Sequence, residues 1–271
     1  MNSPTRPALR YHGGKWRLAP FVLEHFPEHE RYVEPFCGAA SILMRKKPVR
    51  SEIINDLCRD IVSFFEVLRD PGQSAELEKR VSLTPFAREE FDISFQQTEC
   101  PIENARRLLV RSFMSYGSSG IYRRKTGFRS LCTSRNPSHL EWRDFPGAIQ
   151  SFTRRLKGVV IENRDAMELI PRFDAPGTLF YVDPPYVHST QRDQRHKYNF
   201  EMSDDDHREL AKLLRSVKGM VIVSGYPSEL YNELYKGWQY ISRAHVANCA
   251  KKTTECLWIS PNAIVQPELE L

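Results

Sequence analysis

The sequence lacks the features that would assign the protein to a membrane or to a secretory route. None of its apolar runs approaches the roughly 20 residues that a membrane-spanning helix needs. Residues 1–15 include charges but no continuous apolar core, so we expect no signal peptide. We therefore expect no membrane partner.

Cysteine is present without the spacing that usually gives it a structural task. The six cysteines form no C-x-x-C pair, and their spacing suits neither a zinc site nor a disulfide framework. We predict reduced, mostly buried thiols in a cytoplasmic protein, and no metal site. The residues concerned are Cys37, Cys58, Cys100, Cys132, Cys249 and Cys256.

Two common nucleotide-binding patterns are also missing. No G-x-G-x-x-G follows the first candidate strand, so a dinucleotide is not favoured. Gly13-Gly14-Lys15 lacks the G-x-x-x-x-G-K spacing of a P-loop. A P-loop-like nucleotide hydrolase is therefore disfavoured.

The composition is that of a globular protein with a mild excess of positive charge. Of the 271 residues 41% are hydrophobic and 11% aromatic, and the formal net charge is +5. Between residues 106 and 157 the only acids are Glu141 and Asp144. Such clustering is typical of phosphate contacts, although a solvated basic face would look the same. The basic residues of this segment are Arg106, Arg107, Arg111, Arg123, Arg124, Lys125, Arg129, Arg135, Arg143, Arg154, Arg155 and Lys157.

Strand and helix patterns alternate at both ends of the chain and predict an α/β protein. The first region indicates a helix over 15–26, a strand over 31–36, a helix from residue 41 and a strand over 52–57. The last region indicates strands over 159–162, 178–182, 220–224 and 256–260, with a helix over 204–214 capped by Ser203. This is the pattern of a Rossmann-like unit.

The region between them, residues 66–150, is largely helical and basic. It indicates a helix over 103–116, followed by a flexible loop or hairpin over 117–129. We therefore predict a catalytic and cofactor-binding domain, made of residues 1–65 plus 151–271. A mostly helical domain of residues 66–150 is inserted into it.

The string Asp183-Pro184-Pro185-Tyr186 carries the clearest chemical signal. It follows the apolar strand 179–182, and two prolines force the chain to turn at the sheet edge, where open α/β sheets bind ligands. The Asp183 carboxylate and the Pro184 carbonyl can each accept an N–H bond from an exocyclic amine such as that of adenine. The Tyr186 ring can stack on a base turned out of a duplex. A capped strand end with a loop tyrosine is the simpler alternative.

Three further groups precede this string. Small residues in the run 34–41 let the backbone approach a ligand, although a plain tight turn explains them equally well. Asp56 ends the next candidate strand, roughly 20 residues further on, where an acid can bond ribose hydroxyls or merely cap a helix. Tyr11-His12-Gly13-Gly14-Lys15 places backbone N–H groups and a cation where they can face an anion, or forms an ordinary turn.

In this order the four groups resemble the Dam-type (D12 class) family of N6-adenine-specific DNA methyltransferases, over nearly the whole chain. The resemblance implies a Rossmann-like fold, S-adenosylmethionine as the methyl donor and transfer to adenine N6 by base flipping. Asp183, Pro184, Pro185 and Tyr186 would be the catalytic residues. The cofactor would be bound by Tyr11, Lys15, Glu34, Pro35, Phe36, Gly38, Asp56, Asp165 and Asp183.

The resemblance also implies that the inserted basic domain recognises the DNA target. Its hairpin would enter the major groove of double-stranded DNA, where arginine pairs well with guanine. The loop 187–200 would close over the flipped base, with Tyr198 and Phe200 as stacking candidates. The residues expected to contact DNA are Arg111, Tyr116, Arg123, Arg124, Lys125 and Arg129.

Several alternatives remain beside this interpretation. Cytosine-N4 enzymes usually carry serine in place of Asp183, and glutamine-methylating enzymes carry asparagine, so both are disfavoured. RNA adenine is a possible substrate, and a DNA-binding module with an inactive methyltransferase fold is a rival from another class. The intact string at 183–186 argues against that last rival. We expect a bacterial or phage-encoded enzyme that is a monomer or a weak dimer.

Overall fold

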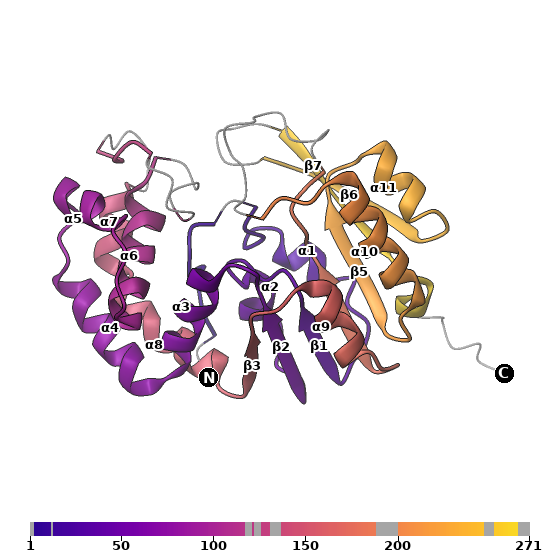
Figure 1. The fold of residues 1–271 in the computed structure, drawn as a ribbon, viewed down its shortest axis with the longest axis horizontal. Helices are drawn as coiled ribbons and strands as arrows, with labels where there is room; N and C mark the ends of the chain where they lie inside the picture. The colour runs from indigo at the N-terminus through magenta and orange to yellow at the C-terminus, as the bar shows by residue number, and fades with distance from the viewer. Residues whose placement is uncertain are drawn as a thin grey trace. The chain divides into compact units, whose positions relative to one another are not determined.

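In this computed structural model the described parts of the chain are residues 3–11, 13–116, 121, 126–130, 137–187, 200–246 and 252–264. They contain a seven-stranded sheet with the order β3-β2-β1-β4-β5-β7-β6 (Figure 1). The strands are β1 Arg31–Glu34, β2 Ser51–Asn55, β3 Val159–Glu162, β4 Thr178–Val182, β5 Met220–Gly225, β6 Gln239–Val246 and β7 Lys252–Ile259. Strands β2, β1, β4 and β5 are parallel, while β7 is antiparallel to both β5 and β6. The predicted Rossmann-like α/β architecture is confirmed.

Helices connect these strands and fill the middle of the chain. They are α1 Ala19–Leu23, α2 Ser41–Arg45, α3 Arg59–Arg69, α4 Pro71–Leu83, α5 Arg88–Ile93, α6 Pro101–Met114, α7 Ser138–Asp144, α8 Ile149–Leu156, α9 Ala166–Phe173, α10 Asp204–Ser216 and α11 Glu229–Leu234. Short 3-10 helices occur at Pro146–Ala148 and Pro261–Ala263. The Ser203 hydroxyl accepts from the backbone N–H of Asp206, and the Asp206 carboxylate accepts from that of Ser203. This reciprocal cap starts α10 at the predicted residue.

Several predicted elements have other bounds in the structure. The strands expected over 31–36 and 52–57 are Arg31–Glu34 and Ser51–Asn55, and the helix expected over 103–116 is Pro101–Met114. The helix expected over 15–26 is shortened to α1. Residues 16–18 form a turn, and the N–H groups of His25 and Phe26 donate to carbonyls only three residues back. Pro20 lies in the first turn of α1, where proline is tolerated because the N–H that it lacks would have no partner within the helix. Strand β6 was not predicted; it pairs along its length with β7, which is longer than the predicted 256–260.

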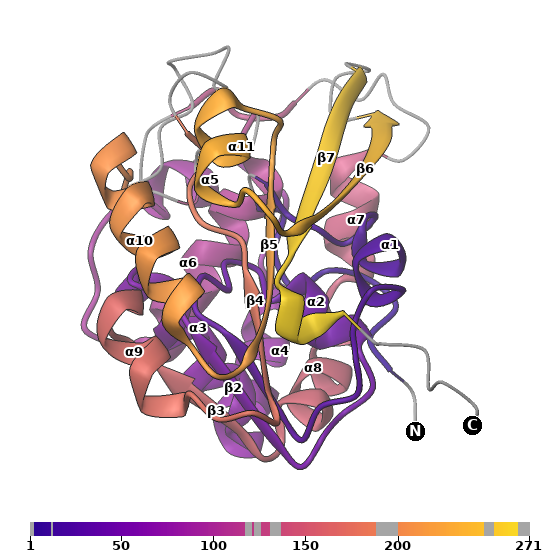
Figure 2. The same cartoon turned by 90° about the vertical axis from the view of Figure 1, so that its right-hand side faces the viewer.

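One compact unit of the chain carries most of the sheet; it comprises Pro20–Cys37, Lys47–Leu57 and Arg164–Leu271. Alternate strand residues point to opposite faces of the sheet. Val33, Phe180 and Val223 belong to a buried cluster with residues of α9, α10 and α11, which cover one face. Figure 2 shows α9 and α10 on one side of the central strands and α1 on the other. Tyr32 and Tyr181 occupy the alternate positions, and both contact the Phe26 ring.

The second compact unit is mainly helical and comprises Met1–Ala19, Gly38–Lys46 and Cys58–Asn163. Its core is aromatic: the Phe113 ring lies 4.8 Å from that of Phe145 and 5.7 Å from that of Trp142. The Trp142 indole donates to the Thr84 carbonyl at 2.8 Å. Helix α3 packs against α6 and α8, so the helical unit extends beyond the predicted bounds of 66–150. The predicted division of roles between domains stays a prediction.

Candidate active site

The carboxyl ends of the parallel strands β2, β1, β4 and β5 lie at one edge of the sheet because the strands run in the same direction. Asp56 follows β2 at this edge, Pro35 and Phe36 follow β1, and Asp183 follows β4. Predicted catalytic and cofactor residues from three strands thus meet at one sheet edge. Tyr226, which was not predicted, joins them from the end of β5.

Asp183 is half-buried and held from the neighbouring strand. The Ser224 hydroxyl on β5 donates to Asp183 Oδ1 at 2.8 Å. Tyr181, two residues before Asp183 on β4, has its phenol oxygen 2.9 Å from the same hydroxyl. Burial, followed by the nearby carboxylates of Asp183 and Glu255, raises the pKa of Tyr181 well above 10. The phenol therefore stays protonated at neutral pH.

Tyr186 is held at both ends. Its hydroxyl donates to the two carboxylate oxygens of Glu255 on β7, at 3.2 and 3.4 Å. Its ring centroid lies 4.4 Å from that of Tyr226, with the planes tilted by 51°. Both Tyr186 and Glu255 are buried, so the plane of the Tyr186 ring is set by contacts on several sides.

Glu34 is the last residue of β1, directly before the turn. It is buried, and its Oε2 accepts from the Tyr32 hydroxyl at 3.0 Å. Burial and then the Glu34 charge raise the pKa of Tyr32 well above 10. The Tyr32 phenol therefore stays protonated and remains a donor to the buried Glu34 carboxylate.

Asn55 is a site residue that sequence reasoning missed. Its amide nitrogen donates to the carbonyls of Pro35 at 2.8 Å and Arg164 at 3.0 Å, and its oxygen accepts from the Arg164 N–H at 2.9 Å. It therefore joins the turn after β1 to the segment that carries Asp165. Asp165 itself is exposed and caps α9 by accepting from the N–H of Met167 at 2.7 Å. Its place directly before Asp56 is the signal that could have identified Asn55.

In the helical unit, Tyr11 packs directly on the turn that follows Cys37. Gly38 has φ +48°, and a Cβ there would stand 2.7 Å from Tyr11 Cε1, so the close approach requires glycine. Ala40 has the same φ of 48°, which strains a residue other than glycine. Lys15 is only 4% exposed, and its ammonium donates to the Gly13 carbonyl at 3.1 Å. Two parts of the predicted cofactor site, the 11–15 turn and Gly38, therefore lie in one unit.

The predicted DNA-reading hairpin has a base in the structure. Ser115 and Phe128 form an antiparallel bridge, Tyr116 donates its N–H to the Gly127 carbonyl at 2.7 Å, and Arg129 donates its own to Met114 at 2.8 Å. Tyr116 is 73% exposed and Arg129 is half-buried, and their contact with DNA stays a prediction. Most of the tip lies outside the described residues, as do most of the loop 187–200 and Tyr198 within it. That undescribed tip includes Arg123, Arg124 and Lys125.

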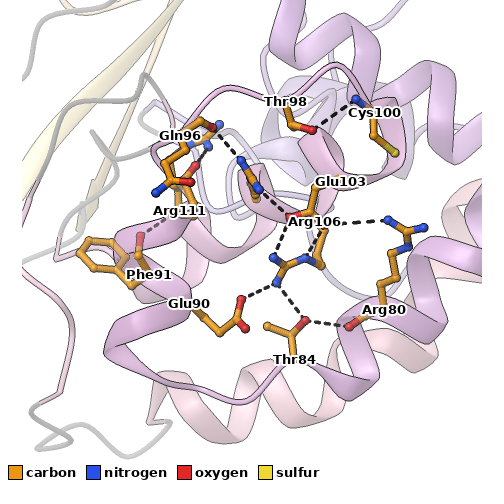
Figure 3. Close-up of polar contacts among 12 residues, drawn as sticks. Arg80, Thr84, Glu90, Phe91, Gln96, Thr98, Cys100, Glu103, Arg106 and Arg111 are labelled. Atoms are coloured by element: carbon orange, nitrogen blue, oxygen red, sulfur yellow. Dashed lines mark hydrogen bonds and ion pairs between the residues drawn. The ribbon is translucent and has the colours of Figure 1, made fainter.

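Part of the basic cluster is internal rather than exposed. Arg106 donates to Glu103, Glu90 and Thr84 at 2.8, 2.7 and 3.1 Å. Figure 3 shows its guanidinium among these three side chains. Hydrogen bonds that Arg106 donates to Glu103 and Glu90 raise its pKa, against the effect of burial. The pair with Glu90 joins α6 to α5, whereas Glu103 lies on α6 itself.

Arg111, which the sequence analysis assigns to DNA contact, is 0% exposed. It donates to the Ser94 carbonyl and lies 3.6 Å from the Asp60 carboxylate. A guanidinium enclosed in this way does not face a phosphate or a base edge, so Arg111 is not a DNA contact in this structure. Helical periodicity places Arg111 beside apolar positions, but only the fold reveals the partners that allow its burial.

Three wider predictions concern the described residues alone. Of the cysteines there, Cys37, Cys58 and Cys256 are buried thiols, as expected, and Cys100 is an exposed one. No group of three potential metal ligands occurs within these ranges. No helix in them is long and apolar enough to cross a membrane.

The parallel block, the antiparallel strands at its edge and the acids at the strand ends define a Rossmann-like methyltransferase fold. The family model of the D12 class N6 adenine-specific DNA methyltransferases matches residues 11–249. The chain belongs to this family and is an adenine-specific DNA methyltransferase.

Bacterial proteins similar to the chain carry the name DNA adenine methylase. That of Salmonella typhi is 24% identical over 251 residues, which cover 89% of this chain and 86% of the relative. That of Vibrio cholerae serotype O1 is 25% identical over 244 residues, or 86% of each chain. That of Escherichia coli K12 is 24% identical over 284 residues, with 97% of this chain and 98% of the relative covered.

Proposed function

We propose that this chain transfers a methyl group from S-adenosylmethionine to N6 of an adenine flipped out of duplex DNA. The placement of Asp183 carries the proposal. It is a half-buried carboxylate at the carboxyl end of β4, held by Ser224 and followed at once by the Pro184 carbonyl. Two acceptors next to each other suit the two N–H groups of one exocyclic amine.

The described residues fit the proposed cofactor. Asp56 presents a half-buried carboxylate beyond β2, which suits ribose hydroxyls, and Asp165 presents an exposed one. Pro35 and Phe36 would border its methionine part, together with Glu34. The family resemblance adds Tyr11, Lys15 and Gly38, and the glycine lets the Tyr11 ring approach the turn closely. S-adenosylmethionine supplies the methyl group from a positive sulfonium and needs no metal.

The protein's task is to prepare the amine. The lone pair of adenine N6 is delocalised into the ring, so the nitrogen is a poor nucleophile. Asp183 and the Pro184 carbonyl accept its two N–H bonds and favour a pyramidal nitrogen whose lone pair faces the donor. Tyr186 stacks on the base, with Pro185 fixing the turn between them. Alignment of donor and acceptor supplies much of the remaining acceleration.

The helical unit supplies DNA recognition in this proposal. Tyr116 and Arg129, at the base of the hairpin, and Arg123, Arg124 and Lys125 between them would contact the duplex. Tyr198 and Phe200, from the loop 187–200, would close over the flipped base. Such an enzyme acts where bacterial or phage DNA lies, in the cytoplasm, and can do so as a monomer or a weak dimer.

The decisive test is the substitution Asp183→Ala. We expect methyl transfer to be lost while the fold and DNA binding are retained, because the variant removes one of the two acceptors at the amine. Transfer of labelled methyl groups to unmethylated DNA, followed by mass spectrometry of the nucleosides, measures both the rate and the product. Asp205→Ala is the matched control, since that carboxylate is 96% exposed on α10.

Three outcomes would contradict the proposal. An active, folded Asp183→Ala protein would refute the catalytic role. N4-methylcytosine as the product would show a different acceptor amine. DNA binding by the unaltered chain without calorimetric heat from S-adenosylmethionine would indicate an inactive binding module.

A further inference from the structure

Three side chains from two neighbouring strands form a line that ends at Asp183. In the register of β4 and β5, Tyr181 lies beside Ile222 and Val182 beside Val223, so the next step places Asp183 beside Ser224. Alternation along β4 puts Tyr181 and Asp183 on the same face. The phenol oxygen of Tyr181 lies 2.9 Å from Ser224 Oγ, which lies 2.8 Å from Asp183 Oδ1.

The chemistry of these groups sets the direction of both hydrogen bonds. Asp183 as a carboxylate only accepts, so the Ser224 hydroxyl gives its single proton to Oδ1. Ser224 then has only lone pairs left for Tyr181, so the phenol must donate to it. Tyr181 can do so throughout the neutral range, because burial and the neighbouring carboxylates keep its proton in place.

We propose that Ser224 is a positioning residue for methyl transfer, and that Tyr181 orients the Ser224 hydroxyl toward Asp183. The proposal rests on the proposed function of Asp183. The relay fixes the rotation of the Asp183 carboxylate relative to the Pro184 carbonyl, so that both acceptors converge on one amine. Neither Ser224 nor Tyr181 touches the substrate in this arrangement.

Burial explains why this relay can hold Asp183 firmly. Ser224 is fully buried near the carboxyl end of β5, and Tyr181 on the neighbouring strand β4 is almost fully buried. Hydroxyl groups so enclosed have few other partners, which keeps each proton in one direction. Asp183 is half-buried, so the Ser224 donor restrains the rotation of a carboxylate that solvent reaches on one side. Small errors of alignment at a reacting group cost large factors in rate.

The test is a cycle of Ser224→Ala, Tyr181→Phe and the double variant, assayed for kcat, KM for DNA and affinity for S-adenosylmethionine. We expect Ser224→Ala to lower kcat by about 10- to 100-fold, with KM and cofactor affinity close to those of the unaltered protein. Tyr181→Phe lowers kcat by a smaller factor. The double variant matches Ser224→Ala, because Tyr181 acts only through the lost hydroxyl.

Two further variants separate positioning from packing. Threonine and valine have nearly the same shape, but only threonine carries a hydroxyl. The Ser224→Thr protein should therefore have a higher kcat than the Ser224→Val protein. Ser260→Ala is the control for stability: Ser260 is also a buried serine bonded to β5, accepting from the Val221 N–H at 2.9 Å. It should lower the melting temperature without changing kcat.

Specific results would overturn the proposal. They are an unchanged kcat in Ser224→Ala, equal kcat in the threonine and valine variants, or independent effects in the double variant. If Asp183→Ala is inactive in the same assays, these results refute the relay alone. If Asp183→Ala is active, the proposed function itself fails.

Discussion

At the scale of the residue, Asn55 shows how much of the site depends on one buried amide. Its amide donates to main-chain carbonyls of Pro35 and Arg164 and accepts from the Arg164 N–H. Pro35 follows β1, and Arg164 lies between β3 and α9. Such a residue contacts no ligand in our proposal. It sets the positions of the residues that do.

We expect Asn55→Asp to lower both stability and cofactor affinity. The new carboxylate oxygen would face the two carbonyls that the amide nitrogen now binds, which costs on the order of 3 kcal/mol of unfolding free energy. Urea denaturation and calorimetry with S-adenosylmethionine measure the two effects. Asn262→Ala is the control, since that amide is exposed and bonds carbonyls only at 3.4 Å. Asn55→Asp that behaves like this control would contradict the assignment.

At the scale of the element, α6 and the hairpin that follows it divide the basic residues into two kinds. Arg106 and Arg111 on α6 bond protein groups inside the helical unit. Exposed Tyr116 and half-buried Arg129 stand where the hairpin leaves the helix. Net charge along the segment does not distinguish these kinds, because it counts an internal guanidinium like an exposed one.

This division predicts that variants of the two kinds of arginine lose different properties, namely stability or DNA affinity. Arg111→Ala should lower the free energy of unfolding by about 3 kcal/mol, because it leaves Asp60 without its buried partner.

Arg123→Ala or Arg124→Ala should instead weaken DNA binding more than cofactor binding, and reduce the salt dependence of DNA binding by about one counterion. Denaturation curves and fluorescence anisotropy with labelled duplex at several salt concentrations measure these effects. Equal losses of DNA and cofactor affinity would remove the recognition role of Arg123 and Arg124.

At the scale of the whole molecule, buried tyrosines link stability to pH. Burial raises the pKa of Tyr32, Tyr181 and Tyr231 well above 10, and that of Tyr235 is also raised. The unfolded chain loses these phenol protons near pH 10, whereas the folded protein keeps them. Stability from this source is therefore complete below pH 10 and declines as the pH rises beyond it.

We expect the free energy of unfolding to fall between pH 10 and 11.5, by up to about 1.4 kcal/mol per pH unit for each such tyrosine. Urea denaturation across this range, with phenolate absorbance as a second signal, measures the slope. Tyr235→Phe should remove the contribution of one tyrosine from the slope of unfolding free energy against pH. Methyl transfer should stay intact. An unchanged slope in that variant would show that Tyr235 ionises alike in both states.

The sequence by itself determined the class of fold and most of the strand positions. Apolar periodicity is a local property, so strands β3 and β4 begin and end where the pattern predicts. The turn at Asp183-Pro184-Pro185-Tyr186 is also local, because two prolines cannot extend a strand. The same string, with those at 11–15 and 34–41, led to the family that the comparison confirms.

Only the tertiary structure decided which side chains support these groups. Ser224 lies 41 residues from Asp183 in the chain, Glu255 lies 69 residues from Tyr186, and Arg111 lies 17 residues from Ser94. Each pair meets through strand register or helix packing, which depends on the whole core rather than on neighbours in sequence. A buried charge such as Arg111 is the extreme case, because its burial is favourable only where the fold supplies its partners.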